Sequence, residues 1–282
     1  MAADNGDITA VVACFNYGAY LGEAVDSLLG QAGGAPRVVV VDDGSDDPAT
    51  LAALDALPAG VEVVRQPNRG VGAARNAGLA RADTPNSIVL DADDRLAPGA
   101  LEALRAPLDA DTSLGFAYGT MRFFGDWEGE LRFPPYDPYA LLYRHTIGLS
   151  ALARREAIEA TGGFDPAFEQ FEDWELWVNA LAHGWRGRQV DAVTLEYRRH
   201  GDTKLAADRG AYRRAFRRLR VKHAALYRDR ARLARQSRLG PAGRLWYRGW
   251  WGARPVPARL ERSLHGVRWR GARAGRAGAG RA

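Results

Sequence analysis

Residues 87–94 read Ser-Ile-Val-Leu-Asp-Ala-Asp-Asp, an apolar run followed at once by three carboxylates. Similar β-rich apolar runs occur earlier in the chain, at residues 8–14, 37–41 and 61–64. Between these runs, side chains follow helical spacing, at residues 20–29, 48–57 and 70–82. Continuous apolar strands that alternate with helices predict an α/β fold with a mostly parallel central sheet flanked by helices.

Each predicted strand in this region is followed by a polar cluster. The clusters are Phe15-Asn16, Asp42-Asp43, Asn68-Arg69-Gly70 and Asp91-Ala92-Asp93-Asp94. The carboxyl ends of parallel strands share one edge of a sheet, and ligands of open α/β sheets bind in the crevice at that edge. We therefore expect the four clusters to converge on one ligand site.

The acidic cluster is a candidate metal site. Asp91, Asp93 and Asp94 repel one another unless a cation lies among them or one of them is protonated. Mg²⁺ or Mn²⁺ meets this need, because either ion is held by one or two carboxylates plus phosphate oxygens of a substrate. A solvated acidic turn explains the same residues, but their place at a strand end favours the metal.

Two further clusters suit a nucleotide. Asp42 and Asp43 can accept hydrogen bonds from a nucleobase or a ribose hydroxyl, although an ordinary Asx turn is the alternative. Residues 68–78 open a helix with glycines, as anion-binding helix N-termini do. Arg75 stands where the dinucleotide fingerprint requires its third glycine, so that motif is absent. Arg75 can instead pair with a phosphate or a base, and a plain glycine-rich turn is the alternative.

A pair of acids lies among aromatic residues farther along the chain. Glu172 and Asp173 stand between Phe171 and Trp174 at a predicted helix start. A carboxylate in such surroundings suits a general base, while helix capping is the structural alternative. His200 follows the last predicted strand, and a lone histidine is more often structural than functional.

Taken together and in order, these motifs resemble the family 2 glycosyltransferases of GT-A fold. The resemblance covers roughly residues 8 to 203 and rests on Ala13-Cys14-Phe15-Asn16, Ser27-Leu28-Leu29 with Gln31, Val41-Asp42-Asp43-Gly44-Ser45, Asn68-Arg69-Gly70, Ala74-Arg75-Asn76-Ala77-Gly78, Leu90-Asp91-Ala92-Asp93-Asp94, Gly162-Gly163-Phe164-Asp165, Glu172-Asp173-Trp174-Glu175-Leu176-Trp177 and Tyr197-Arg198-Arg199-His200. Each motif alone is weak, but the ordered set is specific. It implies a Rossmann-like nucleotide-binding half followed by an acceptor half.

The resemblance also implies residue roles. The nucleotide-sugar side comprises Phe15, Asn16, Asp42, Asp43, Arg75, Asp91 and Asp94. The metal side comprises Asp93, Asp91 and His200. Asp173 is implied as the base that deprotonates the acceptor hydroxyl, with Glu172 as its neighbour.

The implied reaction is a metal-dependent, inverting transfer of a hexosyl or related group. The donor is a nucleoside-diphosphate sugar, by default a UDP-sugar, and the acceptor is a hydroxyl of a glycan or lipid-linked molecule in cell-envelope or polysaccharide biosynthesis. Two rival functions remain: a nucleotidyltransferase on a related fold, and a non-catalytic protein that binds nucleotides or nucleic acid. A nucleotidyltransferase would not require Asp173.

Charge divides the chain into two predicted domains. Residues 209–282 hold 22 Lys and Arg against two acids, a net charge of +20, whereas the preceding residues carry a net charge of −15. We expect a catalytic domain at residues 1–208, with its halves meeting near residue 110, and a basic extension that is helical and then poorly ordered. The extension has three interpretations: an interfacial helix with an aromatic anchor on an anionic membrane, docking on the acidic domain, or RNA binding. No recognised RNA motif supports the third, so a nucleic-acid partner is not expected.

The cellular location of the protein is predicted from sequence features that are absent. No run of about 18 apolar residues is present, so no membrane-spanning helix is expected. The start of the chain is polar and acidic, unlike a secretory signal. A single cysteine, Cys14, excludes a disulfide framework and a Cys-based zinc site. We expect a cytoplasmic protein, and peripheral association with the inner face of the cell membrane is the alternative.

Overall fold

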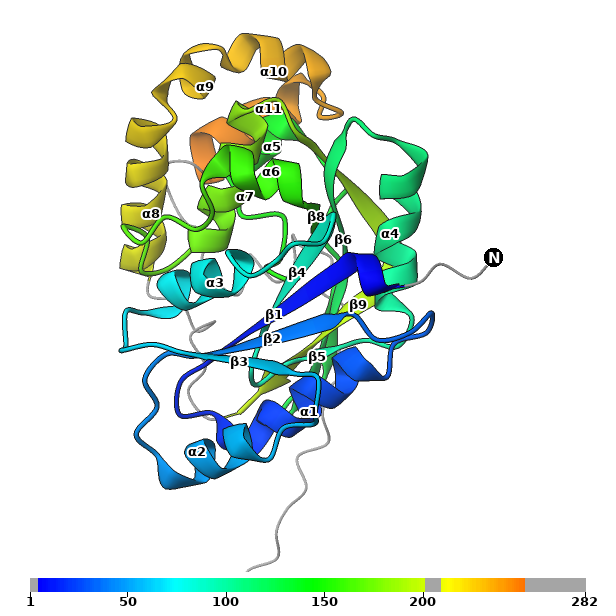
Figure 1. The fold of residues 1–282 in the computed structure, drawn as a ribbon. Coiled ribbons are helices and arrows are strands. Elements are labelled where there is room, and N and C mark those ends of the chain that lie inside the picture. Colours follow the sequence, from blue (N-terminus) through cyan, green and yellow to red (C-terminus); the bar gives the residue numbers. More distant parts are fainter. Residues whose placement is uncertain (1–4, 201–208, 252–282) are drawn as a thin grey trace, which may run out of the picture.

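The computed structural model describes residues 5–200 and 209–251, which form one large sheet with helices packed around it (Figure 1). The strands are β1 (Ile8–Cys14), β2 (Arg37–Asp42), β3 (Glu62–Arg65), β4 (Asn86–Asp91), β5 (Arg95–Leu96), β6 (Leu114–Gly125), β7 (Gly129–Leu131), β8 (Leu152–Arg154) and β9 (Arg186–Arg199). Their order in the sheet is β3-β2-β1-β4-β8-β6-β9-β5, with β7 paired to β6.

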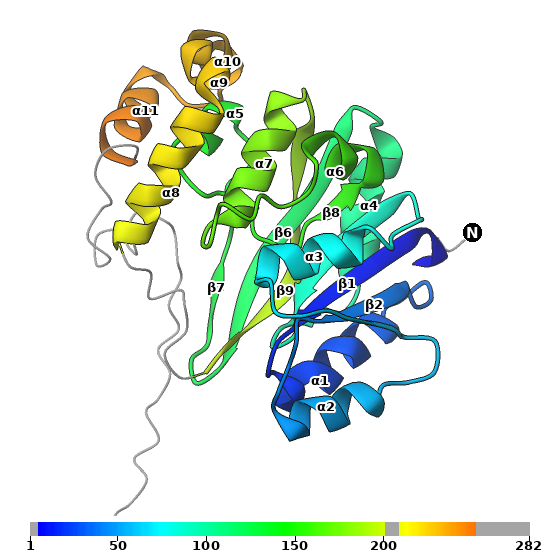
Figure 2. The same cartoon turned by 60° about the vertical axis from the view of Figure 1, so that its left-hand side comes forward.

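The helices follow the order predicted for an α/β protein. They are α1 (Gly18–Leu29), α2 (Pro48–Asp55), α3 (Val71–Leu79), α4 (Ala100–Ala110), α5 (Pro138–Leu141), α6 (Arg155–Thr161), α7 (Glu172–Ala182), α8 (Arg209–Lys222), α9 (Ala224–Arg228), α10 (Arg230–Gln236) and α11 (Pro241–Trp246). A 3-10 turn, η1 (Asn5–Asp7), precedes β1, and a π-helical turn, η2 (Tyr247–Trp251), follows α11. Helices α1 and α2 lie on one face of the parallel strands, and α3 lies on the other (Figure 2).

The first four strands of the predicted parallel sheet are confirmed. Strand β1 lies between β2 and β4 and is parallel to both, while β3 continues the parallel arrangement beyond β2. Ala13 is paired with Val41 on one side and with Asp91 on the other. The three strands therefore end at the same level, and the polar residues that follow them start from one edge.

The second half makes the sheet mixed. Strand β8 runs antiparallel to β4 and β6, and β5 runs antiparallel to β9, whereas β6 and β9 are parallel over their length. Strands β5, β7 and β8 and helices α5 and α6 were not predicted. Most of them are only two to four residues long, too short to show a period of two or 3.6.

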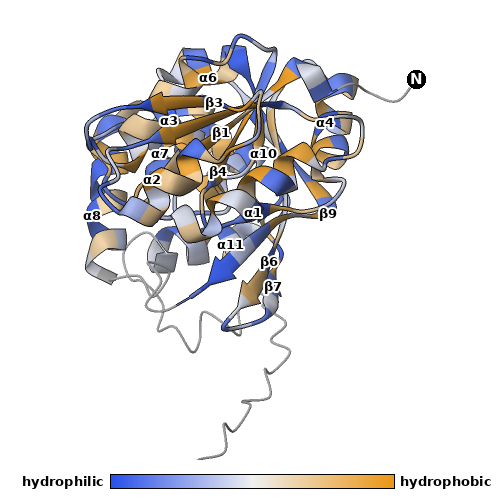
Figure 3. Ribbon diagram, turned by 60° about the horizontal axis from the view of Figure 1, so that its bottom comes forward, coloured by the Kyte–Doolittle hydropathy of each residue, from blue (hydrophilic) through white to orange (hydrophobic). Residues whose placement is uncertain are grey.

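The parallel strands lie at the centre of the core, and α3 approaches the sheet closely. Figure 3 shows the parallel strands around β1 and β3 as predominantly apolar, in agreement with complete burial of Val11, Val40 and Leu90. At Gly78 of α3, an added Cβ would lie 2.2 Å from Cγ1 of Val11. Glycine at this position lets the α3 backbone pack directly on β1 and sets the height of α3 above the sheet.

The described part of the basic extension is helical and packs beside α5 and α7 (Figures 1 and 2). Its buried side chains on α8 are Ala211, Ala215, Phe216 and Leu219. Its arginines at 213, 214, 217, 218 and 220 are exposed. The apolar face of α8 is therefore used for packing on the protein itself. The predicted boundary near residue 208 and the predicted disorder at the chain end fall on residues outside the described ranges. None of the described helices combines the length and apolar character needed to cross a membrane.

Candidate active site

A buried arginine joins three elements at the carboxyl edge of the sheet. Arg75 of α3 is 4% exposed, and its Nη2 donates to Oδ1 of Asp91 at the end of β4 over 2.7 Å. Its Nη1 donates to Oε1 of Glu172 in the first turn of α7. The structure thus brings together residues that lie 16 and 97 positions apart in the sequence.

Neighbouring charges in this cluster shift the pKa values of Arg75 and Glu172. Burial by itself would lower the pKa of Arg75, but the carboxylates of Asp91 and Glu172 outweigh it, so the pKa is raised and the side chain stays cationic. Burial raises the pKa of Glu172, although Arg75 opposes this effect. The raised pKa of Glu172 therefore favours its protonated form more than in a solvent-exposed glutamate.

Asp173 forms a second pair with a histidine. Oδ2 of Asp173 lies 3.0 Å from Nε2 of His145, an ion-pair contact whose angles fall outside those of a hydrogen bond. Burial would raise the pKa of Asp173, but His145 and then Arg75 overcome it, and the pKa is lowered. For His145, burial would lower the pKa, yet Asp173 overcomes it, and the pKa is raised. Both members are thereby favoured in their charged forms.

The backbone at both ends of the site adopts an unusual conformation. Among the described residues, the non-glycine positions with positive φ are Asn16 at 58° and Phe171 at 61°. Phe171 immediately precedes α7 and so sets the direction in which Glu172 and Asp173 leave the loop. Such conformations are costly and concentrate at functional sites, which fits the position of these two residues.

Asp93 lies against His200, two residues that the resemblance assigned to the metal side. Oδ2 of Asp93 is 3.0 Å from Nε2 of His200, and the histidine ring packs on Tyr20 with centroids 4.9 Å apart. The pKa of Asp93 is raised, mainly because the carboxylate is partly buried. The hydrogen bond with His200 lowers this pKa, and the negative charge of Asp91 raises it, but burial has the largest effect. This carboxylate therefore gains from any cation placed beside it.

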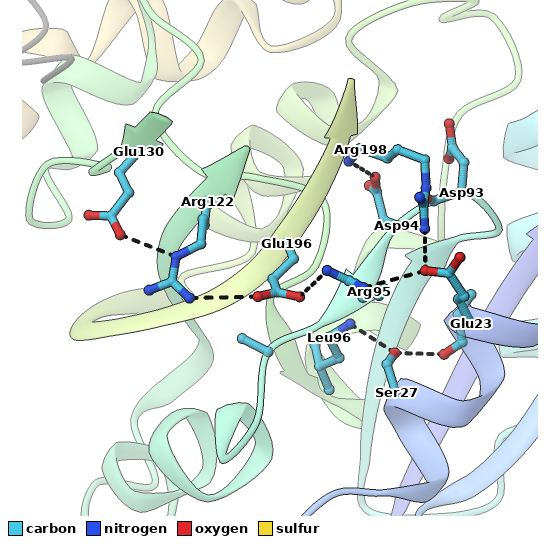
Figure 4. A network of polar contacts seen from close by, with 12 residues as sticks. Glu23, Ser27, Asp93, Asp94, Arg95, Leu96, Arg122, Glu130, Glu196 and Arg198 are labelled. Atoms are coloured by element: carbon cyan, nitrogen blue, oxygen red, sulfur yellow. Dashed lines mark hydrogen bonds and ion pairs between the residues drawn. The ribbon is translucent and has the colours of Figure 1, made fainter. Parts of the chain in front are cut away.

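Asp94 is turned into the protein. Its side chain is buried, and Oδ1 accepts a hydrogen bond from the backbone N–H of Arg198 over 2.8 Å. Burial and the neighbouring charges of Asp91 and Asp93 raise the pKa of Asp94 well above its usual range. Figure 4 shows Asp94 at one end of a chain of ion pairs that ties β9 and β5 to α1.

That chain of ion pairs fixes the backbone around Asp93. Arg198 donates from Nε to the carbonyl oxygen of Asp93 over 2.8 Å and from Nη2 to Glu23 over 2.7 Å (Figure 4). Arg95 joins Glu23 to Glu196, at 3.4 and 3.0 Å. The loop after β4 is thus held from two sides, by α1 and by β9.

The acids after β2 organise loops. Oδ1 of Asp42 accepts from the backbone N–H of Ser45 over 2.9 Å, which stabilises the turn after β2. Asp43 accepts from Gln66 Nε2 and from the backbone N–H groups of Arg69 and Gly70, over 2.7, 2.9 and 2.8 Å. Asp43 therefore fixes the loop between β3 and α3, whose last residues lead to Arg75.

Phe15 and Asn16 extend from the end of β1 toward the same loops. The Asn16 side chain donates to Asp46 over 2.7 Å and accepts from the backbone N–H groups of Asp46 and Asp47 over 3.1 Å each. Phe15 is 41% exposed, an unusual state for a phenylalanine and one that leaves its ring accessible to a ligand.

The residues present fit a divalent ion that binds together with a substrate. Among the described residues, no three His, Cys, Asp or Glu side chains already converge as a complete metal cage. Mg²⁺ is usually held by one or two carboxylates and completes its shell with waters and substrate phosphates. Asp93, with a partly buried carboxylate and His200 beside it, offers such a partial ligand set.

Two participants were missed from the sequence, His145 and Arg198. His145 follows Tyr143-Arg144 in a segment with no motif and reaches Asp173 only through the tertiary fold. Arg198 lies within the Tyr-Arg-Arg-His motif, but nothing in that motif indicates that its side chain would support Asp93. No local sequence signal marks His145, because its stacking on Trp174, with centroids 6.3 Å apart, joins residues 29 positions apart.

Several known proteins are similar to this chain in sequence. Succinoglycan biosynthesis protein ExoO of Rhizobium meliloti (strain 1021) is 33% identical over 199 residues, which are 64% of this chain and 57% of ExoO. The uncharacterized glycosyltransferase Rv0539 of Mycobacterium tuberculosis (strain ATCC 25618 / H37Rv) is 32% identical over 211 residues, which are 71% of this chain and 89% of Rv0539. The chain thus spans little more than half the length of ExoO.

The fold also has relatives among solved structures. The crystal structure of S. aureus TarS superposes with a TM-score of 0.62 at 19% identity, covering 85% of this chain and 42% of TarS. The crystal structure of S. aureus TarS 1-349 in complex with UDP gives a TM-score of 0.59 at 19% identity, covering 85% of this chain and 69% of that one. At this identity the similarity establishes the fold, a GT-A-like α/β arrangement.

The family itself is decided by a direct match. The model of the family described as glycosyl transferase family 2 matches residues 9–161, more than half of the chain. The matched segment includes the ends of β1, β2 and β4 and all of α3, whereas Glu172, Asp173 and His200 lie beyond it. The resemblance inferred from the sequence motifs is therefore confirmed, and the nucleotidyltransferase alternative is disfavoured. The chain belongs to glycosyl transferase family 2.

Proposed function

We propose that this chain transfers a sugar from a nucleoside-diphosphate sugar, by default a UDP-sugar, to a hydroxyl of a glycan or lipid-linked acceptor, with inversion at the anomeric carbon. The observation that carries the proposal is the bridge from Asp91 through Arg75 to Glu172, which places the acid pair of α7 beside the polar end of β4. A donor site and an acceptor base are thereby held in one rigid cluster.

The donor side is supported by the strand-end residues. The exposed ring of Phe15 is available to stack on a base, and the loops held by Asn16 and Asp43 form the adjoining wall. TarS has been crystallised with UDP and with UDP-GlcNAc, which supports a nucleotide-sugar donor for a chain of the same fold. Asp42 and Asp94 act from within this wall, through the turn and the β9 contact that they stabilise.

We assign Asp93 and His200, with Asp91 nearby, as the residues that would hold Mg²⁺ or Mn²⁺. A bound divalent ion would neutralise the negative charge that gathers on the departing diphosphate. Asp93 is partly buried, which disfavours its negative charge, so a bound cation would stabilise the ionised carboxylate. Tyr20 packs on His200 and fixes the direction of the imidazole.

On the acceptor side, Asp173 is the proposed general base. Its lowered pKa keeps it ionised near neutral pH, so it is ready to accept the proton of a hydroxyl that attacks the sugar carbon. The partly exposed ring of Phe171, which packs on the buried Trp174, offers an apolar surface of the kind that sugar rings contact. Arg75 stays charged and orients Glu172 beside this base.

The biological setting follows from the relatives. ExoO is named for succinoglycan biosynthesis, and we extend to this chain a role in the synthesis of a polysaccharide or another cell-envelope glycan. We place the reaction in the cytoplasm, at the inner face of the membrane where the acceptor is lipid-linked.

The proposal is tested by donor hydrolysis, which needs no known acceptor. A panel of nucleotide sugars is incubated with wild type and Asp93→Ala, with and without Mn²⁺ or Mg²⁺, and released nucleoside diphosphate is measured. Asp55→Ala is the matched control, because Asp55 is an exposed acid on α2 whose ion pair, among the described residues, is with Arg65 at the surface. We expect metal-dependent release from one donor that is lost in Asp93→Ala and kept in Asp55→Ala.

Donor binding is read in the same samples by thermal shift. A donor that stabilises wild type only with metal supports the proposal even when hydrolysis is slow, because a ligand that binds the native state raises the melting temperature. Neither hydrolysis nor metal-dependent stabilisation with any donor in the panel would reject the proposed activity.

A further inference from the structure

A cavity lined by arginines lies on the C-terminal helices, away from the acids of the candidate active site. Its volume is about 280 Å³, and it is lined by Tyr139, Arg228, Arg230, Ala231, Ala234 and Arg248. Three of the six lining residues are arginines and none is acidic. Such a cavity favours an anion, and the fork of the guanidinium group suits phosphate oxygens in particular.

The positive charge of this cavity is not neutralised nearby. Described residues 209–251 contain 14 Lys and Arg but one acid, Asp229, and that acid pairs with Arg232. Within the described ranges, no carboxylate forms an ion pair with Arg228, Arg230 or Arg248. Arg230 is held in place by donation from Nη1 to the carbonyl oxygen of Tyr227 over 2.8 Å. The cavity therefore holds an excess of oriented positive charge.

Exposed apolar residues adjoin the cavity in the sequence. Leu245 and Trp246, at the end of α11, are 68% and 39% exposed, and Arg248 follows two positions later in η2. The rings of Trp246 and Trp250 stack with centroids 4.9 Å apart and planes 6° apart. Tryptophan is enriched where proteins meet the membrane interface, because its ring is apolar while its N–H is polar.

The apolar face of α8 does not provide this contact, because Phe216 and Leu219 are buried against the protein. The interfacial helix considered in the sequence therefore cannot be α8 in this conformation. Apart from the single Val221 of α8, the exposed large apolar side chains in the described part of the basic extension are Leu245 and Trp246 on α11.

We propose that α11, η2 and the arginine cavity form a docking site for an anionic membrane. The cavity would take the phosphate of a phospholipid headgroup, while Leu245 and Trp246 enter the boundary between headgroups and acyl chains. The arginine cavity and the exposed apolar side chains both contribute to binding, because apolar burial and electrostatic attraction add at a membrane interface. This site does not depend on the proposed transfer reaction, and it would place a lipid-linked acceptor within reach.

The test is sedimentation of the full chain with vesicles. Vesicles of phosphatidylcholine alone are compared with vesicles of phosphatidylcholine and phosphatidylglycerol. The cavity variant combines Arg228→Gln, Arg230→Gln and Arg248→Gln. The matched control removes equal charge from the exposed face of α8, with Arg213→Gln, Arg217→Gln and Arg218→Gln. Thermal melts of all variants check that they fold.

We expect wild type to bind the anionic vesicles and not the neutral ones. Each arginine near an anionic surface contributes about 1 kcal/mol, so the cavity variant should bind up to about 100-fold more weakly. The control should lose several-fold less than the cavity variant, and Leu245→Ser with Trp246→Ser should weaken binding although the charge is unchanged.

Three results would overturn the proposal. Equal losses in the cavity variant and the α8 control would mean diffuse attraction without a site. Undiminished vesicle binding by the cavity variant would remove the cavity from the contact. Absence of vesicle binding together with cavity-dependent binding of single-stranded RNA would identify nucleic acid, the other phosphate-bearing class, as the ligand.

Discussion

Replacing Arg75 with methionine tests whether one buried cation holds the candidate active site together. The side chain is 4% exposed and bridges Asp91 of β4 to Glu172 of α7. Methionine has a similar length and helix propensity, so α3 itself should persist. The substitution therefore leaves two carboxylates without their cation and changes little else.

The size of the effect follows from the exposure of the two acids. Loss of one partner from a buried ion pair costs about 3–5 kcal/mol, because the other charge stays buried and unpaired. Side-chain exposure is 31% for Asp91 and 12% for Glu172, so Asp91 can turn to water while Glu172 remains confined. We expect Arg75→Met to lower the free energy of unfolding by about 3 kcal/mol near neutral pH.

The assay is urea unfolding followed by far-UV circular dichroism. Arg65→Met is the control, because the Arg65–Asp55 pair is exposed on both sides and such pairs contribute about 1 kcal/mol or less. Adding Glu172→Gln to Arg75→Met should recover part of the loss, since the orphaned charge is then removed. A loss no larger than that of Arg65→Met, or a double variant no more stable than Arg75→Met, would refute the reasoning.

Two further predictions concern packing and pH. Gly78→Ala should destabilise the protein by about 1–3 kcal/mol, because its Cβ would overlap Val11, whereas Gly22→Ala, with open space around it in α1, should be neutral or stabilising; thermal melts distinguish the two. His145→Gln should cost most stability between the ordinary pKa values of Asp and His. Because the pKa of His145 is raised by folding, its contribution to stability is complete below the pKa of the unfolded state and is lost as pH rises through the pKa of the folded state. Because the pKa of Asp173 is lowered by folding, its contribution to stability is present above the pKa of the unfolded state and is lost as pH falls through the pKa of the folded state. Unfolding titrations across this range check it, and a stability difference between wild type and His145→Gln that does not vary with pH would contradict it.

The parallel half of the fold could be predicted from the sequence because each of its strands is a continuous apolar run. Strand β4 is recognisable because Ile88, Val89 and Leu90 form an apolar run typical of a strand buried on both faces, and Asp91 marks where burial ends. The convergence of the polar clusters followed from topology alone, and the pairing of Ala13 with both Val41 and Asp91 agrees with it.

The rest depended on contacts that no local pattern encodes. Strand β5 consists of Arg95 and Leu96 and exists only because β9 returns beside it. His145 has no motif, and its meeting with Asp173 depends on the path of the chain between α5 and α7. Tertiary structure also decides what an acid does: Asp94 resembles Asp93 in sequence, yet Arg198 binds it into the protein.

The C-terminal helices bear on the site through α7. Glu175 of α7 is fully buried, and its Oε1 meets both Nε2 of His223 and Nζ of Lys222 over 2.8 Å. Glu175 lies two positions after Asp173, and the residue between them, Trp174, stacks on Tyr212 of α8 with centroids 5.2 Å apart. A helix whose first turn carries the proposed base is therefore anchored by the basic extension. The charge asymmetry of the sequence thus has a structural role within the chain, because Lys222 of the basic extension pairs with the buried Glu175 of α7.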